Sequence, residues 1–405
     1  MNIKKFSEAM GEIDSKYVEK AINYKPNQKK QIWVKWGAIA ACLAIIVYAG
    51  TRRFPQETHE EMAELPMLSI TENTSEGMGF EGYWAYEVSE LVNANPWSKS
   101  LEISTLPVYR NPLTYDENYI ASGADFDKMQ EFLLEIADRF GINTNTLTIT
   151  DDVPDEETKQ MISGKLQMGG GVIPDGYFDP TKLITEADGL KIEVDQTMTA
   201  TIFFEPAVSL ADEYNFTNYA PYEDIVAVAE HLKTEYKDII GIDNPQINIC
   251  GGDYNIYAQQ SYSIAFFDAS GNNTQKIINY NFNRVTFYCN SEGELWLARI
   301  CQPDLSEIVG NYPIITPKQA SELLLNGNFL TSVPYEMPGS EYVRKMELVY
   351  RTGEWEEYYM PYYRFYVELP EDELENGLKT YGVYYVPAVD GTYISNMPTW
   401  DGSFN

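Results

Sequence analysis

An apolar stretch of membrane length, residues 32–50 (IWVKWGAIAACLAIIVYAG), constrains this chain more than any other feature. As an α-helix its nineteen residues would rise about 28 Å, which matches the hydrocarbon core of a bilayer. Its single charge, Lys35, lies near the N-terminal end beside Trp33 and Trp36, where a long side chain reaches the headgroups and indole rings are common. We therefore expect a transmembrane helix.

Two alternatives to an anchor stay open, a cleaved signal peptide and a lipoprotein signal. Val47-Tyr48-Ala49 resembles a cleavage site, and Ile39-Ala40-Ala41-Cys42 resembles a lipobox. However, the 31 residues before the run are long and mixed in charge for a signal peptide, and eight mostly apolar residues follow Cys42. Both observations favour an anchor.

Charge differs between the two sides of this run. Residues 1–53 contain ten Lys and Arg against four Asp and Glu, a net charge of +6, so the rest carries −38 within a total of −32. Because basic residues stay on the cytoplasmic side, we expect a single-pass protein of the cell membrane with a cytoplasmic N-terminus and an extracellular C-terminal bulk. A field of this sign repels nucleic acid and excludes it as a partner of the larger portion.

The remaining patterns predict an α+β fold, in which modules each pack a helix on an antiparallel sheet. Aromatic residues make up 14% of the chain, which is too many for a disordered stalk. The expected segments are a cytoplasmic amphipathic segment (1–31), the transmembrane helix (32–50), an acidic linker (51–79) and three α+β modules (80–206, 207–310 and 311–405).

Helix start and stop signals place the principal helix of each module. Asp125 caps a helix over 124–141, and a second, weaker helix ends near residue 169. In the second module a helix spans 221–240. In the third, Thr316 begins a helix with a capping-box Gln319 three residues on.

Strand patterns fill the space between these helices. The segments FGINTNTLTI and IGIDNPQINI follow the first and second helices in the same order, which indicates a weak internal repeat. Residues 270–272 and 291–293 are expected to be hairpin turns. The expected strands are 146–150, 190–194, 198–204, 254–268, 274–290, 294–301, 342–351, 357–369 and 381–389.

The strand around 358–367 (YYMPYYRFYV) carries the densest chemistry on the chain. Both of its faces are apolar or aromatic, so it is either a central strand buried on both sides or an exposed platform that stacks on a sugar or holds a peptide. In the second case the ligand-binding candidates are Tyr358, Tyr362, Tyr366 and Arg364.

A helical stripe in the cytoplasmic segment offers a different kind of contact. Phe6, Met10, Ile13 and Tyr17 recur at helical spacing, which is typical of a helix that lies on the inner membrane surface or binds a cytoplasmic partner. We expect these four residues to be the partner-helix candidates.

No catalytic, metal or cofactor motif is present. His59 and His231 are the only histidines, and no Ser-His-Asp, Cys-His or zinc spacing can be built from them. Cys250, Cys289 and Cys301 are an odd number, so one bridge or simple burial remains open for them. We expect no catalytic residue, metal or cofactor.

Two stretches resemble known proteins. The N-terminal FSEAMGEIDSKYVEKA with WVKWGAIAACLAIIV is similar to the start of many uncharacterised single-pass proteins of Gram-positive anaerobes. The C-terminal IITPKQASELLLNG, MELVYR, YYMPYYRFYVEL and YGVYYVPAV resemble extracytoplasmic regulatory domains of the YycH/YycI kind and PepSY-like domains. These resemblances imply action through partner proteins across or outside the membrane.

We therefore expect a membrane-anchored extracytoplasmic binding or regulatory protein that contacts a protein, a peptide or a cell-wall ligand, with a signalling protein as a possible partner. One alternative is a carboxylate-based hydrolase of glycans, which needs two facing carboxylates in a deep pocket with aromatic walls. A second alternative is a carbohydrate-binding module, which needs exposed tyrosines on the 358–366 strand.

Overall fold

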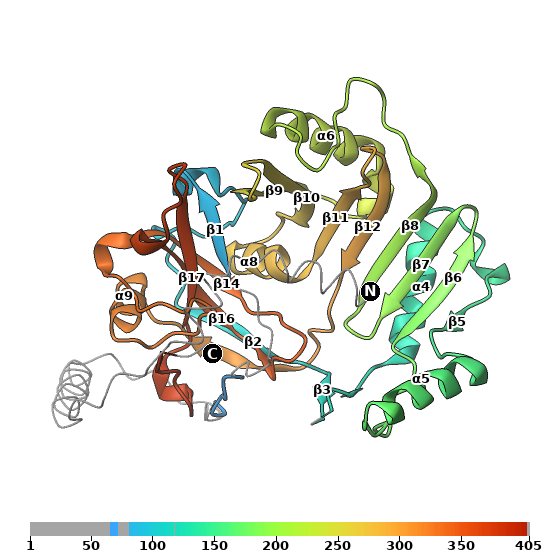
Figure 1. Ribbon diagram of the computed structural model, residues 1–405, viewed down its shortest axis with the longest axis horizontal. Coiled ribbons are helices and arrows are strands. Elements are labelled where there is room, and N and C mark those ends of the chain that lie inside the picture. Colours follow the sequence, from blue (N-terminus) through green and yellow to red (C-terminus); the bar gives the residue numbers. More distant parts are fainter. Residues whose placement is uncertain (1–64, 72–80, 117, 403–405) are drawn as a thin grey trace, which may run out of the picture. The chain divides into compact units, whose positions relative to one another are not determined.

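A large antiparallel sheet forms one side of the described part of the protein (right in Figure 1). The computed structural model describes residues 65–71, 81–116 and 118–402, which belong to one compact unit. The predicted transmembrane helix and the stripe of Phe6, Met10, Ile13 and Tyr17 lie outside these ranges. Within the described part, no helix is both long enough and apolar enough to cross a bilayer.

This sheet has eight strands in the order β5-β6-β7-β8-β12-β11-β10-β9, with every neighbouring pair antiparallel. The strands are β5 (Thr150–Asp151), β6 (Lys182–Ala187), β7 (Leu190–Asp195), β8 (Thr199–Val208), β9 (Pro245–Tyr254), β10 (Gln260–Asp268), β11 (Arg284–Cys289) and β12 (Leu295–Cys301). The two halves of the sheet run outward from a central seam between β8 and β12.

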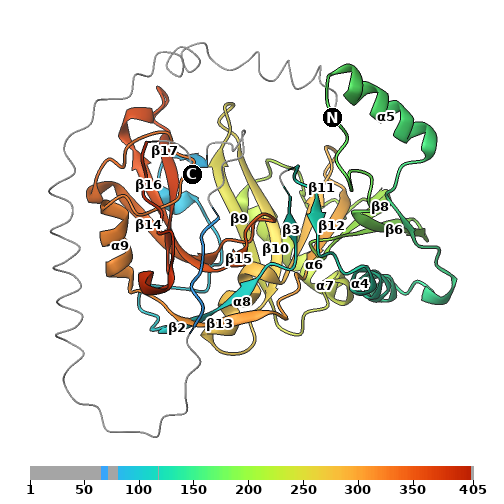
Figure 2. The ribbon, with the colours of Figure 1, turned by 90° about the horizontal axis from the view of Figure 1, so that it is seen from below.

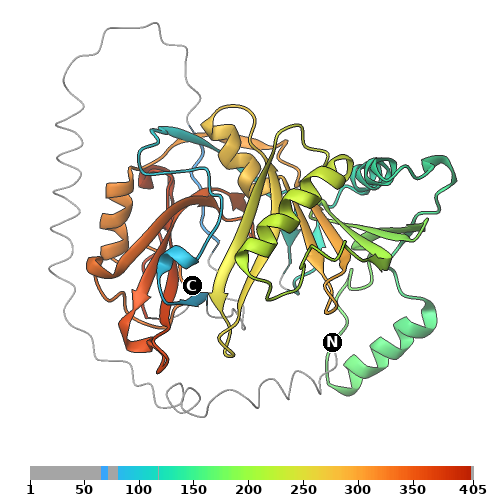
Figure 3. The same cartoon turned by 90° about the horizontal axis from the view of Figure 1, so that it is seen from above.

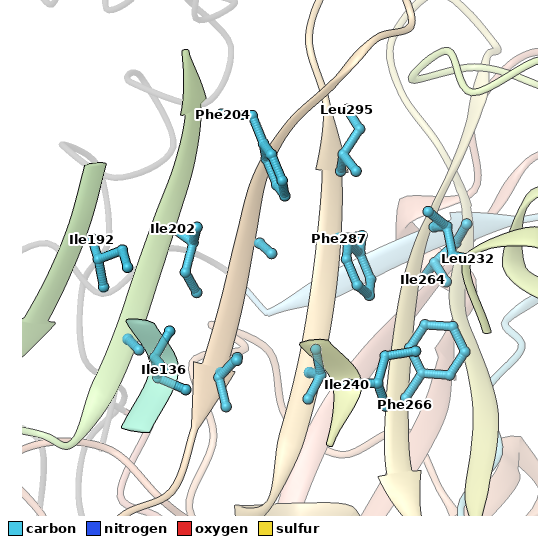
Figure 4. Close-up of a cluster of buried hydrophobic side chains, with 14 of the residues drawn as sticks. Ile136, Ile192, Ile202, Phe204, Leu232, Ile240, Ile264, Phe266, Phe287 and Leu295 are labelled. Atoms are coloured by element: carbon cyan, nitrogen blue, oxygen red, sulfur yellow. The ribbon is translucent and has the colours of Figure 1, made fainter. Parts of the chain in front are cut away.

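Two helical segments cover one face of this sheet. α4 (Phe126–Arg139) packs on β6, β7 and β8, while α6 (Tyr222–Glu235), followed by α7 (Lys237–Ile240), packs on β9 and β10 (Figure 3). Their apolar side chains meet those of the strands in one continuous core, as Figure 4 shows for Ile136 of α4 and Leu232 of α6.

The two halves share one plan, which confirms the helix, glycine and strand order of the predicted internal repeat, although residues 147–149 lie outside any strand while their counterparts, residues 247–249, belong to β9. Each half begins with a helix that ends near a glycine of positive φ, Gly141 (+74°) or Gly241 (+61°), and then enters an outermost strand of the sheet. The predicted cap of α4 is also confirmed, because the side chain of Asp125 accepts a hydrogen bond from the backbone N–H of Lys128. α5 (Glu156–Met168) is an addition to the first half that stands apart from the sheet (Figure 2) and buries no residue fully.

The C-terminal part builds a second, four-stranded sheet in the order β1-β17-β16-β14 and a three-stranded sheet in the order β13-β2-β15. Their strands are β1 (Gly82–Ala85), β2 (Thr105–Arg110), β13 (Ile308–Pro313), β14 (Val343–Tyr350), β15 (Tyr358–Tyr359), β16 (Pro361–Leu369) and β17 (Lys379–Pro387). α9 (Pro317–Leu325) packs on β17 and begins with the predicted capping box of Thr316 and Gln319. A small hairpin pairs β3 (Thr114–Tyr115) with β4 (Ala121–Ser122).

These sheets confirm the α+β class but do not follow the predicted module boundaries. The boundary between residues 206 and 207 falls inside β8, and the boundary between 310 and 311 falls inside β13. β1, expected in the first module, pairs with β17 of the third. Part of the predicted linker is folded as well, since Leu68 is fully buried and its backbone N–H donates to the carbonyl of Tyr393.

Two predicted strands are wrong. The strand expected at 146–150 is a turn and an irregular segment, of which only Thr150 belongs to a strand. Residues 274–290 were expected to be extended, but the structure has α8 (Asn273–Phe282) followed by β11. The expected hairpin turn at 270–272 is instead the start of this helix, because the side chain of Asn272 accepts a hydrogen bond from the backbone N–H of Gln275. α8 contacts β10 and β11 of the large sheet and β14 of the C-terminal sheet, so it joins the two (Figure 1).

Candidate functional site

The side chains of the large sheet alternate between two unlike faces. On β11, Val285 and Phe287 enter the core beneath the helices, whereas Arg284, Thr286 and Tyr288 line a cavity on the opposite face. Cross-strand pairing extends this polar face over five strands. One row across β7, β8, β12, β11 and β10 consists of Glu193, Thr201, Arg299, Thr286 and Ala265.

Two cavities lie where the polar face meets α8 and the C-terminal sheets. The first, which we call the sheet-face cavity, has a volume of about 460 Å³ and is lined by residues of β8 to β12. The second, the inner cavity, has a volume of about 500 Å³ and is lined largely by residues of β14 and the segment that follows it. Asn281, Arg284, Thr352 and Glu354 line both cavities, so the two form one cleft.

Arg284 and Arg299, which line the sheet-face cavity, differ from the other arginines of the described ranges. Both are exposed, and neither has a hydrogen-bond or ion-pair partner for its guanidinium among the described residues. The five others, Arg110, Arg139, Arg344, Arg351 and Arg364, each form an ion pair with a carboxylate. In a portion of the chain with a net charge of −38, carboxylates are abundant, so two arginines without one are available for an external anion.

Aromatic side chains stand beside these arginines. Tyr288 lines the sheet-face cavity and is 36% exposed, and Trp296 of β12 is 39% exposed. The ring centroid of Trp296 lies 5.9 Å from that of Phe203 on β8. At the other end of the cleft Trp355, which lines the inner cavity, lies 5.2 Å from Tyr119 between ring centroids. Both ends therefore offer aromatic surface to a ligand.

The inner cavity holds charged groups that are already paired. Nη2 of Arg351 lies 2.8 Å from Oε1 of Glu356, and Nη2 of Arg364 lies 2.5 Å from Oε2 of Glu347. Burial raises the pKa of Glu356, while the charge of Arg351 opposes that shift. The inner cavity is therefore bordered by internal ion pairs, and it shares the unpaired Arg284 with the sheet-face cavity, which alone contains Arg299.

Glu347 shows how such a pair joins distant segments. Its carboxylate is buried and accepts hydrogen bonds from Arg364, from Lys345 and from Nδ2 of Asn93. Burial alone would raise the pKa of Glu347, but the charges of Arg364 and Lys345 hold it below its ordinary value. This carboxylate therefore connects β14 to β16 and to the segment before β2.

The tyrosine candidates from the sequence do not form an open platform. Tyr358, Tyr362 and Tyr366 are 8%, 0% and 5% exposed, so the exposed-platform alternative is wrong. Tyr362 and Tyr366 belong to β16, which lies between β14 and β17 as a central strand. α9 and its neighbours cover one side of β16, while Leu68 and the region of β1 cover the other. Arg364, the fourth candidate, lines the inner cavity but is paired with Glu347.

The cysteines and the described histidine form no catalytic group. Cys250, Cys289 and Cys301 are free thiols. His231 stacks on Tyr214 with 4.1 Å between ring centroids, on a helix of the opposite face. Among residues 65–71, 81–116 and 118–402, no three His, Cys, Asp or Glu side chains are grouped to hold a metal ion.

Comparison with known protein families gave no match, and no curated protein matches the chain. The candidate site therefore rests on the geometry of this chain. The sequence carried a signal for it that we did not use, namely the alternation of polar and apolar residues in RVTFYC and LWLARIC around a hairpin turn. That register places Arg299 opposite Thr286 and Arg284 opposite Cys301 on one face.

Proposed function

We propose that this protein is a membrane-anchored extracytoplasmic binding protein of a regulatory kind, whose ligand lies on the polar face of the eight-stranded sheet. The observation that carries the proposal is the presence of two unpaired arginines, Arg284 and Arg299, in a cleft of a strongly acidic chain. Helices cover the other face of this sheet, and the ligand takes the remaining one.

The apolar run at 32–50 and the charge difference on its two sides support the anchored topology. In this arrangement residues 1–31 are cytoplasmic, and the stripe of Phe6, Met10, Ile13 and Tyr17 contacts the inner membrane surface or a signalling protein. Protease treatment of intact cells tests the topology, because it should degrade residues 65–402 and leave the N-terminal segment. Full protection of residues 65–402 would contradict it.

Site-specific crosslinking in intact cells tests the binding face. A photoreactive phenylalanine analogue at Tyr288 or Trp296 should crosslink a ligand, whereas the same analogue at Met168 of α5, which is 91% exposed, should not. Because Met168 is more accessible than either test position, random collision would label it at least as well. Equal labelling at all three positions would reject the proposal.

A glycan hydrolase remains the second candidate, because the inner cavity brings three carboxylates near aromatic walls. Glu81, Glu354 and Glu356 line it together with Trp355 and Tyr385. The raised pKa of Glu356 is typical of a general acid, although Arg351 already holds this carboxylate. If Glu356 is that acid, Glu356→Gln should lower the release of reducing ends from glycans by about 10²- to 10⁴-fold. No release by the unaltered chain would exclude this function.

A further inference from the structure

We propose that the ligand of the polar face is a saccharide that carries a carboxylate or phosphate group, and that Arg284 and Arg299 bind this group together. The inference rests on the proposed function and names its ligand class. Its basis is the combination of free cations, free hydroxyls and exposed aromatic rings on neighbouring strands.

The two arginines are diagonal neighbours on adjacent strands. Arg299 pairs with Thr286, and Arg284 pairs with Cys301, so both side chains leave the same face of the sheet. Diagonal positions on antiparallel strands are about 7–8 Å apart, which two long side chains can bridge to share one anion. Guanidinium groups suit carboxylate and phosphate because their paired N–H donors match two oxygens.

Hydroxyl groups flank the arginines. Thr201 and Thr286 are the cross-strand neighbours of Arg299 on its two sides. Neither side-chain hydroxyl has a hydrogen-bond partner among the described residues. Since a hydroxyl both donates and accepts, these two threonines can bind sugar hydroxyls on either side of the anion.

The aromatic rings lie one step further along the same strands. Leu297 of β12 pairs with Phe203 on one side and Tyr288 on the other, two residues from Arg299, and Trp296 adjoins this row. Two residues in a strand span about 7 Å. A saccharide of two or three units covers that distance, with one ring against the aromatic row and its anionic group at the arginines.

Backbone pairing argues against an extended peptide. β8, β11 and β12 are interior strands, with neighbours on both sides, so their backbone N–H and C=O groups are already used in the sheet. A peptide that binds by strand addition needs a free edge and finds none on this face.

The charge of the whole chain restricts the ligand further. A long polyanion would be repelled by the net charge of −38. This repulsion extends over a Debye length of about 8 Å in solution, and over a longer distance within the cleft. A short saccharide with one anionic group places its charge at the two arginines and little elsewhere. Among the described residues that line the sheet-face cavity, the only carboxylate is that of Glu354, whereas two side chains, Arg284 and Arg299, are cations.

Calorimetric titration of the full chain in detergent micelles tests the inference with four probes. These are tri-galacturonate, maltotriose phosphate, neutral maltotriose and tetra-glutamate. We expect one or both of the anionic saccharides to bind more tightly than maltotriose and tetra-glutamate, and the stronger of the two identifies the carboxylate or the phosphate as the natural group.

Two variants remove the charge and keep a shorter polar side chain, Arg284→Gln and Arg299→Gln. Each should weaken binding of the preferred anionic saccharide by about 10- to 100-fold, as expected for a charged hydrogen bond, and leave the weak binding of maltotriose unchanged. Lys318→Gln is the matched control, because Lys318 is 88% exposed on α9, away from the cleft, and should have no effect. Both arginines are exposed, so the variants should fold, which their circular dichroism verifies.

Several results would overturn the inference: equal affinity for neutral and anionic saccharides, tighter binding of tetra-glutamate, no binding of any saccharide, or unchanged affinity in both arginine variants. The crosslinking experiment separates this failure from failure of the proposed function. If Tyr288 and Trp296 still crosslink a ligand, the binding face stands and only its ligand class is wrong.

Discussion

The substitution Glu347→Gln gives the sharpest test of how the C-terminal sheet is stabilised. Glu347 is 4% exposed, and its carboxylate accepts hydrogen bonds from Arg364 (2.5 Å to Nη2), Lys345 (2.8 Å) and Asn93 (2.7 Å). Glutamine has nearly the same shape, but it removes the charge and turns an amide donor toward groups that are themselves donors. Arg364 is then left 19% exposed without its carboxylate.

The expected loss follows from these contacts. Hydrogen bonds to charged groups contribute about 1.5–3 kcal/mol each, but their contributions are not additive in one cluster. Removal of one partner from a buried ion pair costs about 3–5 kcal/mol in known cases. We therefore expect Glu347→Gln to lower the free energy of unfolding at neutral pH by about 3–5 kcal/mol.

Urea denaturation of the full chain, followed by tryptophan fluorescence, measures this loss. Glu322→Gln is the control, since Glu322 is 61% exposed and 3.9 Å from Lys318, and it should leave the free energy of unfolding unchanged. A loss below about 1 kcal/mol for Glu347→Gln would refute the reasoning, because a buried, charged cluster cannot be that weak.

The pH dependence provides a second readout of the same group. The pKa of Glu347 is lowered in the folded protein relative to its ordinary value of 4.5. Its contribution to stability is therefore fully present above pH 4.5 and is lost as the pH falls through the lower, folded pKa. The difference between the unaltered chain and Glu347→Gln should shrink in that acidic range. A difference that stays constant would show that the charge of Glu347 is not the source of its effect.

Three further predictions follow from the backbone and the thiols. Asn272→Ala should lower the free energy of unfolding by about 1 kcal/mol in urea denaturation, because it removes the cap of α8, and no loss would contradict that cap. Gly252→Ala should lower the free energy of unfolding by more than about 2 kcal/mol, because φ is +94° and a Cβ would lie 1.9 Å from the carbonyl oxygen of Glu90. By contrast, Gly164→Ala on α5 has open space around it and should stabilise the helix by about 0.5–1 kcal/mol. Alkylation of the unreduced, denatured chain and mass spectrometry should find all three described cysteines free, and a disulfide between any two would contradict their placement.

For Cys250 and Cys301 the thiol prediction rests on strand spacing. Cys250 on β9 and Cys301 on β12 are separated by β10 and β11, which places them about 14 Å apart at the usual spacing of strands. A disulfide requires Cα atoms within about 7 Å. The sequence left a bridge open because it does not state which strands are neighbours.

Local signals in the sequence identified most helices and the character of the central strand. Asp125 and Thr316 predicted two helix starts correctly, since a cap depends on a few adjacent residues. The alternation expected for 358–367 holds across β15 and β16, with Tyr359 and Tyr363 in one core cluster and Tyr358 and Tyr362 in another. Helix caps and strand alternation depend only on residues that are close together in the chain, so a single sequence is enough to predict them.

Long-range pairing was not predictable in the same way. β1 joins β17 across nearly the whole described chain, and no local pattern states such a pairing. α8 was mistaken for a strand because its inward residues, Ile277, Ile278, Asn281 and Phe282, also fit a mixed apolar run. The unpaired state of Arg284 and Arg299 depends on where every carboxylate lies in space, so only the structure could reveal it.

The seam between β8 and β12 has a consequence for assembly. Thr199 and Cys301, which pair across it, are 102 residues apart in sequence, whereas each half of the sheet is built from closer neighbours. Loop closure over such a distance is slow, so we expect the halves to form first and to expose the edges of β8 and β12. At high concentration we therefore expect β8 of one copy to pair with β12 of another, so that refolding gives a strand-exchanged dimer in which both sheets are complete.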